Sequence, residues 1–263
     1  MIRPLEITSL TKVFETPSGA HTVVKDFTAR IAPGEFVSLL GHSGCGKSTV
    51  LSIIAGLQRA TFGGVVVDGR EVTEPGLERA FVFQSPCLLP WLTAGENVML
   101  AARQAHPRLT ASGQKELARK YMGLVGVEEF APQLPADLSQ GTQQRVSIAR
   151  ALVLEPRFLL LDEPFGMLDS ITRCELQDML LEIWERERKT VVLVTHDVDE
   201  AMYLSDRILL MTDGPESRVG LELTMPFGRP RDRAAVLEHP QYFRVRNQVI
   251  GFLEDHTRQF KAA

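Results

Sequence analysis

An α/β fold with parallel strands is the fold class that this sequence predicts. Two continuous apolar runs, at residues 158–161 and 191–194, have the composition of strands that are covered on both faces, as the strands of a parallel sheet are. Between them, residues 170–188 have the spacing of an amphipathic helix. A third apolar run of strand length, residues 35–40, leads directly into a glycine-rich segment. Together these features predict a sheet whose strands alternate with helices.

The glycine-rich segment has the pattern Gly-x-x-x-x-Gly-Lys-Ser. It follows the run at 35–40 and precedes residues 49–55, which can begin a helix, so it has the strand–loop–helix context of a phosphate-binding loop. Glycines let several backbone N–H groups point at one anion beside the positive end of a helix. Lys47 would reach the β- and γ-phosphates, and the Ser48 hydroxyl would ligate Mg²⁺. The alternative is a glycine-rich turn that binds nothing. The predicted nucleotide-binding residues are Gly41, His42, Ser43, Gly44, Cys45, Gly46, Lys47, Ser48 and Thr49.

Composition narrows the possible functions. A net charge of −4 gives no basic excess to neutralise phosphates, which argues against broad nucleic-acid binding. The cysteines Cys45, Cys87 and Cys174 are far apart and lack metal-type spacing, which suits a reducing cytosol. Cys45 occupies a variable position of the loop and is interpreted as filler. No apolar stretch approaches the roughly 20 residues needed to cross a bilayer, so a membrane role would come through a partner.

The rest of the chain divides by residue pattern. Period-two stretches at 5–14, 21–24 and 27–31, with turn residues at 17–19, predict a β-rich layer that also includes 65–67. Helical spacing over 114–125 and a last helix near 241–255 are also expected. The predicted domains are a nucleotide-binding α/β core with its β subdomain (1–87 and 156–215), a helical subdomain (88–155) and a C-terminal extension (216–263).

Polar side chains follow two of the apolar strands. Asp162 and Glu163 end the run at 158–161, at the sheet edge where α/β proteins bind ligands. Asp162 would support Mg²⁺, and Glu163 would polarise the water that attacks the γ-phosphate. A solvated acidic turn is the alternative. His196 follows the run at 191–194 and is expected at the same edge, although a lone histidine there is commonly a satisfied surface or core residue.

A further segment, Leu-Ser-Gln-Gly-Thr-Gln-Gln-Arg at 138–145, precedes an expected helix at 146–154. A serine, a glycine and a helix N-terminus together make an anion receptor. Taken alone, the segment is an ordinary helix cap.

In their order along the chain, these segments resemble the motif set of ATP-binding-cassette (ABC) transporter ATPases. The resemblance covers about residues 5–215 and includes Gln84 and the pair Leu168-Asp169. It implies the P-loop NTPase fold of that family, with a RecA-like core sheet, an antiparallel β subdomain and an inserted helical subdomain. It also implies ATP and Mg²⁺ as cofactors and an ATP hydrolase coupled to import.

Residue roles follow from the same resemblance. Phe14 would stack on adenine, although an aromatic residue at the end of a first strand is more often core. Gln84 would contact Mg²⁺ and the attacking water, and His196 would touch the γ-phosphate. The catalytic residues would be Lys47, Gln84, Glu163 and His196. The metal would be held by Ser48, Gln84 and Asp162.

Residues 138–145 resemble the signature segment of the family, which implies a site that two subunits share. Ser139 and Gly141 would grip the γ-phosphate of ATP held by the other subunit, and Asp169 would belong to the loop that links the two sites. The family usually has Leu-Ser-Gly-Gly-Gln, so Gln140 and Thr142 are departures that affect the tuning of this contact.

Some stretches resemble one branch of the family. Residues 82–93, 162–169 and 195–201 are similar to importers of nitrate, nitrite, cyanate, bicarbonate, sulfonate and taurine, and 166–169 with 237–243 look most like the nitrate-type subunits. The expected function is to energise nitrate or nitrite uptake, with the other anions of this branch as alternatives. A soluble ABC protein of DNA repair or translation, or a P-loop kinase or metabolic ATPase outside the family, would fit less well.

Partners are implied as well. They are a second ABC ATPase subunit (the same chain or a paralogue), a transmembrane permease and, through it, a secreted or periplasmic substrate-binding protein, with no nucleic acid. The chain would lie peripherally at the cytoplasmic face of the plasma membrane. The apolar loop 87–92 is predicted to dock the permease.

Overall fold

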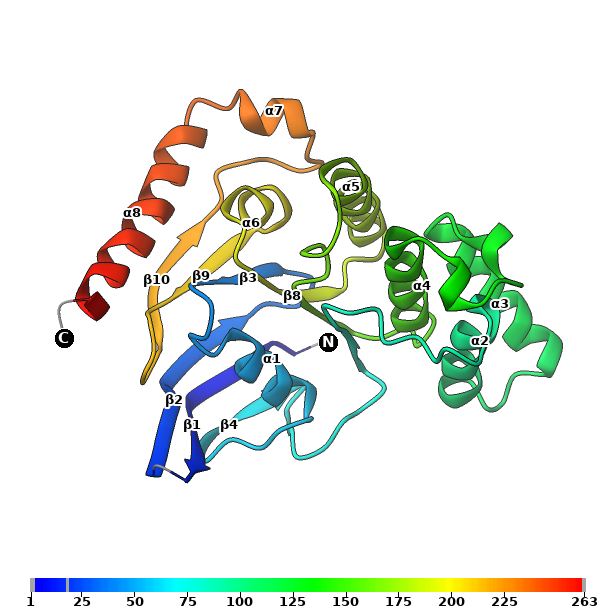
Figure 1. The fold of residues 1–263 in the computed structure, drawn as a ribbon, viewed down its shortest axis with the longest axis horizontal. Coiled ribbons are helices and arrows are strands. Elements are labelled where there is room, and N and C mark those ends of the chain that lie inside the picture. The colour runs from blue at the N-terminus through cyan, green and yellow to red at the C-terminus, as the bar shows by residue number, and fades with distance from the viewer. Residues whose placement is uncertain (1–2, 18, 262–263) are drawn as a thin grey trace. The chain divides into compact units, whose positions relative to one another are not determined.

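The computed structural model describes residues 3–17 and 19–261, with side chains described through residue 256 (Figure 1). It splits into two compact units, Met1–Pro75 with Thr190–Ala263, and Gly76–Lys189. Each unit is built around its own strands and carries its own share of the predicted site residues.

The first unit contains an antiparallel sheet with the strand order β2-β1-β4-β5, which confirms the predicted β-rich layer. Its strands are β1 (Leu5–Thr16), β2 (Gly19–Ile31), β4 (Phe62–Val67) and β5 (Arg70–Glu71). The sequence predicted two stretches where β2 is one strand. The reason is a bulge, because β1 has one residue and β2 has two between the pairs Leu10–Phe27 and Lys12–Val24, and Asp26 has a φ of 53°. Ser18, in the predicted turn, lies outside the described residues.

The same unit contains parallel strands. β3 (Phe36–Leu40) pairs in parallel with β8 (Thr190–Thr195) and β9 (Arg207–Met211), and β10 (Val219–Thr224) pairs antiparallel with β9. Every residue of β3 and β8 is buried, which confirms the reading of their apolar runs. Helix α1 (Lys47–Ala55) packs on β8, and α6 (Val198–Leu204) packs on β3 and β8. The chain ends with α7 (Arg233–Leu237) and α8 (Tyr242–Lys261).

The second unit is mainly helical. Strands β6 (Arg79–Val82) and β7 (Phe158–Asp162) pair in parallel, and α4 packs on β6. Figure 1 shows α2, α3 and α4 packed against one another. The helices are α2 (Ala94–Ala105), α3 (Ala111–Leu124), α4 (Gln140–Leu152) and α5 (Ser170–Glu187), with 3₁₀ turns η1 (Glu128–Phe130) and η2 (Pro135–Asp137). Within the described parts of both units, each helix is too short or too polar to span a bilayer.

Candidate nucleotide-binding site

The phosphate-binding loop occupies the turn between β3 and α1, as predicted. Gly44 and Gly46 have φ angles of 81° and 94°, a region in which other residues are strained. A Cβ at Gly46 would also come within 2.7 Å of Val24 Cγ2. The loop geometry therefore requires glycine at both positions, and the first turn of α1 follows it directly.

Lys47 is 5% exposed and is held across this loop. Its Nζ donates to the backbone oxygens of Gly41 (2.7 Å) and His42 (2.8 Å). The Ser217 hydroxyl donates to the backbone oxygen of Cys45 in the same loop. These bonds fix the loop backbone and place an ammonium over it.

Cys45 fills space inside the loop. Burial raises the pKa of its thiol, while the nearby Lys47 lowers that pKa in part. A Cβ at Gly41 would lie 2.9 Å from Cys45 Sγ, so the absence of a side chain at Gly41 makes room for the thiol. A protonated, buried thiol suits the role of filler better than that of a nucleophile.

His196 directly follows β8, the strand next to β3, which leads into the phosphate-binding loop. Leu40 of β3 pairs with Thr195 of β8 in parallel register, so the loop and His196 both follow the carboxyl ends of neighbouring strands. His196 is exposed. Asp197 caps α6 by accepting a 3.0 Å hydrogen bond from the backbone N–H of Glu200, which fixes where the chain turns after His196.

In the second unit, Gln84 and Glu163 lie together. Val82 of β6 pairs with Leu161 of β7, and Gln84 and Glu163 each lie two residues after these partners. Gln84 Nε2 donates a hydrogen bond to Glu163 Oε2 at 3.3 Å. Glu163 has a φ of 45°, a left-handed conformation that costs about 1–3 kcal/mol for a residue other than glycine. Such strain is typical of functional positions. Asp162, at the end of β7, is half-buried.

The signature residues lie at the N-terminus of α4. The Ser139 hydroxyl accepts from the backbone N–H of Thr142 at 3.1 Å, and the two hydroxyls are 2.9 Å apart. A Cβ at Gly141 would lie 2.5 Å from Thr172 Cγ2. Asp169 caps α5, and its hydrogen bonds with Thr172 lower the pKa of its carboxyl. Ser139 and Asp169 are therefore structural caps in addition to any functional role.

Phe14 is 36% exposed, so it is a surface residue of β1 and not a core residue. Lys12 Nζ lies 4.9 Å from the centre of its ring. An exposed aromatic ring with a cation near it is available for stacking.

Comparison with known proteins identifies the family. The profile of the ABC transporter family matches residues 24–166. The chain belongs to the ABC transporter family. It is 47% identical over 242 residues to the nitrate import ATP-binding protein NrtD of Synechococcus elongatus, covering 92% of this chain and 88% of that one. It is 46% identical over 249 residues to the bicarbonate transport ATP-binding protein CmpD of Synechocystis sp., covering 95% and 88%.

Solved structures agree on the fold of this ABC ATPase. The dimeric, post-hydrolysis state of the ATP-binding cassette MJ0796 with ADP and Pi has a TM-score of 0.75 and 33% identity, covering 85% of this chain and all of that one. The predicted P-loop NTPase fold is confirmed. The chain binds ATP and couples ATP hydrolysis to transport, as the resemblance implied.

Two contacts that support the phosphate-binding loop were not predicted from the sequence. Ser217 holds the Cys45 carbonyl, and the backbone oxygen of Leu253 lies 3.0 Å from His42 Nε2. Both come from the C-terminal part of the chain, and neither belongs to a local pattern that sequence reading detects.

Proposed function

We propose that this chain is the ATP-hydrolysing subunit of an importer of a small anion, specifically nitrate or nitrite. Its 47% identity to a nitrate import ATP-binding protein supports the anion, together with the resemblance of 166–169 and 237–243 to nitrate-type subunits. Bicarbonate is the second candidate because a bicarbonate transport protein is nearly as similar. The ATPase itself does not contact the anion, so the substrate is inferred from relatives.

The observation that carries the hydrolytic role is the contact between Gln84 and Glu163. In this proposal Glu163 accepts a proton from the attacking water, and Gln84 orients that water and the carboxylate. Lys47 keeps its bonds to the loop carbonyls, directs its remaining N–H donor to phosphate oxygens and offsets their charge. His196 contacts the γ-phosphate from the edge it shares with the loop.

The available donors suit Mg²⁺. Ser48 in the first turn of α1, the amide oxygen of Gln84 and the carboxylate of Asp162 are all oxygen donors, the kind that Mg²⁺ prefers. When bound, the ion would neutralise charge on the β- and γ-phosphates.

A second ATPase subunit would complete each site. Ser139 and Gly141 lie at the N-terminus of α4, outside the unit that carries Lys47, and we propose that they reach ATP held by a second copy or a paralogue. The dimeric state of the similar cassette supports this arrangement.

The permease is proposed to dock on the loop 87–92 and the adjoining pocket. Trp91 is 71% exposed, and Asn97 of α2 fixes the loop by bonding both backbone groups of Leu89, at 2.8 and 3.2 Å. Arg150 also donates to the backbone oxygens of Cys87 and Pro86. A large aromatic side chain on a fixed loop is a suitable anchor for a partner.

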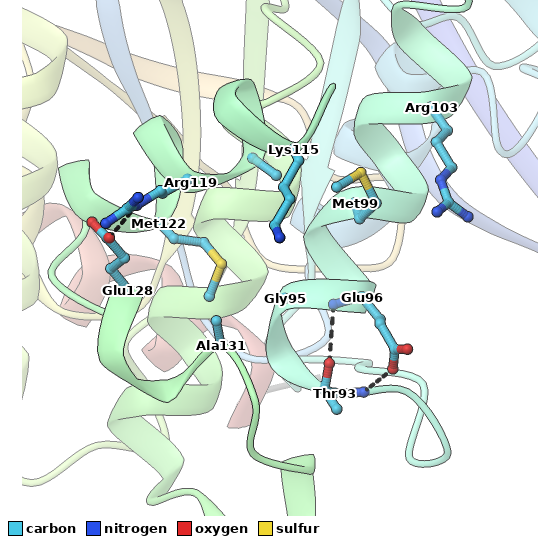
Figure 2. Close-up of a pocket in the computed structure, with 11 residues that line it drawn as sticks. Thr93, Gly95, Glu96, Met99, Arg103, Lys115, Arg119, Met122, Glu128 and Ala131 are labelled. Carbon is cyan, nitrogen blue, oxygen red and sulfur yellow. Dashed lines mark hydrogen bonds and ion pairs between the residues drawn. The ribbon is translucent and has the colours of Figure 1, made fainter. Parts of the chain in front are cut away.

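The pocket has a volume of about 440 Å³ and lies between α2, α3 and η1 (Figure 2). Figure 2 shows Met99 and Met122 beside charged side chains, with Glu96 bonded to Thr93 and Arg119 paired with Glu128. Its charged side chains are three basic and two acidic: Arg103, Lys115, Arg119, Glu96 and Glu128. This excess of positive charge favours a cytoplasmic permease helix that offers apolar side chains and a carboxylate. The ATPase would thereby lie peripherally at the cytoplasmic face of the membrane.

Growth of a deletion strain tests the proposed substrate. Deleting the gene should abolish growth on low nitrate as sole nitrogen source and leave growth on ammonium unchanged. Normal growth on nitrate with loss of growth at low inorganic carbon would assign the chain to bicarbonate instead.

A further inference from the structure

The last helix, α8, contacts the phosphate-binding loop. His42 Nε2 lies 3.0 Å from the backbone oxygen of Leu253, and because a carbonyl oxygen only accepts, the imidazole N–H donates. The backbone oxygen of His42 in turn accepts a hydrogen bond from Lys47 Nζ at 2.8 Å. Two consecutive polar contacts therefore join α8 to the ammonium of the nucleotide-binding loop.

The start of α8 is fixed to α6 by three side chains, here called the Asp199 clamp. The Tyr242 hydroxyl donates to Asp199 Oδ1 at 2.7 Å, and Arg246 Nε donates to the same oxygen at 2.8 Å. Asp199 lies in the first turn of α6, three residues after His196. The helix thus contacts the segments that follow two neighbouring strands of the sheet.

The middle of α8 packs closely on β10. Val249 is fully buried, and a Cβ at Gly220 of β10 would come within 2.5 Å of Phe252 Cζ. Figure 1 shows α8, in red, running alongside β10. One residue before Leu253, the ring of Phe252 therefore sets how closely the helix approaches the sheet.

We propose that α8 positions the phosphate-binding loop, and that α8 acts on Lys47 through its contact with His42. The inference rests on the proposed role of residues 41–49. With α8 docked, the His42 ring is fixed and its carbonyl holds the lysine ammonium in place, so little ordering remains when ATP binds. With α8 displaced, the loop loses this support, and ATP binds more weakly although the chain stays folded.

The test weakens the Asp199 clamp and measures ATP affinity on the full chain, well below its melting temperature. Arg246→Glu places two carboxylates together at the clamp. Arg244→Glu makes the same charge change at an exposed position of α8 and is the matched control. We expect Arg246→Glu to raise the Kd of a fluorescent ATP analogue about two- to tenfold, the range for loss of one net hydrogen bond. Arg244→Glu should leave Kd unchanged, and adding Asp199→Lys to Arg246→Glu should restore it.

A double-mutant cycle shows whether the effect passes through His42. If α8 acts through this residue, His42→Phe and Arg246→Glu together should raise Kd no more than the larger single effect. A Kd within twofold of wild type in Arg246→Glu, or additive effects in the cycle, would overturn the inference. A purely structural helix would lower the melting temperature and leave Kd unchanged.

A second displacement avoids charge altogether. Gly220→Leu forces Phe252 away from β10, and it should raise Kd and increase hydrogen exchange in α8 together. Increased exchange without a change in Kd would also overturn the inference. If wild-type protein failed to bind the analogue, the proposed role of the 41–49 loop would fail instead, so the two failures are distinguishable.

Discussion

Gln84 Nε2 donates a 3.3 Å hydrogen bond to Oε2 of Glu163, and the two residues follow the carboxyl ends of the paired strands β6 and β7. Because the amide nitrogen faces the carboxylate, the amide oxygen of Gln84 is directed elsewhere and is available as a ligand. Glu163 adopts a left-handed conformation at this point. The pair therefore joins the carboxylate of a residue with a strained backbone to an amide that orients it, an arrangement suited to activating water.

Removing the carboxylate of Glu163 should stop hydrolysis and not binding. Glu163→Gln should keep ATP affinity and lower the hydrolysis rate by about two to four orders of magnitude, the range for loss of a general base. The variant should also accumulate as an ATP-bound dimer on size exclusion. Glu129→Gln, at an exposed carboxylate, is the control. Hydrolysis near the wild-type rate in Glu163→Gln would mean that another group is the base.

Two substitutions of Ser139 separate its capping role from its proposed contact with ATP. Ser139→Ala removes the cap of α4 and should cost about 1 kcal/mol of unfolding free energy. Ser139→Asp keeps a capping oxygen but adds a negative charge that would oppose the γ-phosphate. Both variants should lose hydrolysis, while chemical denaturation should show destabilisation in the alanine variant alone. If the Ser139→Asp variant hydrolysed ATP at the wild-type rate, Ser139 would not be a residue that contacts the γ-phosphate.

Trp91 tests the permease-docking surface. Since its side chain is 71% exposed, Trp91→Ala should change the unfolding free energy by less than about 0.5 kcal/mol, the usual range for surface substitutions. ATP binding should persist, while co-purification with the permease and transport should be lost. Leu100→Ala, at a 49% exposed position of α2 that does not line the pocket, is the matched control. A large fall in melting temperature in Trp91→Ala would show that Trp91 is structural.

The Asp199 clamp should weaken at alkaline pH. Burial, and then the hydrogen bond and charge of Asp199, raise the pKa of Tyr242 to about 12 from its ordinary value of 10.0. Since the folded-state pKa lies above the unfolded value, the stabilisation is complete below pH 10 and is lost as pH rises from 10 to 12.

Comparison with Tyr242→Phe isolates this effect. Between pH 10 and 12, the unfolding free energy of wild type should fall more than that of the variant, by up to about 2 kcal/mol. Parallel curves for the two proteins would show that the phenol does not couple to folding.

The parts of the fold that depend on local pattern could be predicted. The runs at 158–161 and 191–194 are fully buried in β7 and β8, and the strand–loop–helix context placed the glycine-rich loop correctly. Helix α4 begins at Gln140, earlier than the predicted 146, because Ser139 caps a first turn that lacks an apolar face. The bulge at Asp26 likewise interrupts the alternation of apolar and polar residues, although β2 continues from Gly19 to Ile31.

Contacts between distant segments could not be predicted. The bond between His42 and Leu253 joins residues 211 positions apart, and no periodicity or motif records such a pairing. Thr142, a departure from the family signature, places its hydroxyl 2.9 Å from that of Ser139. The sequence showed this departure but not that the new side chain would bond to the signature serine.

Uptake of isotope-labelled nitrate tests the central claim most directly. A strain that lacks this gene should regain nitrate uptake when it expresses the wild-type chain, and should not regain it with Glu163→Gln at equal protein level. This result would tie nitrate import to ATP hydrolysis at this site. Undiminished nitrate uptake in the deletion strain, or full restoration by Glu163→Gln, would contradict the account.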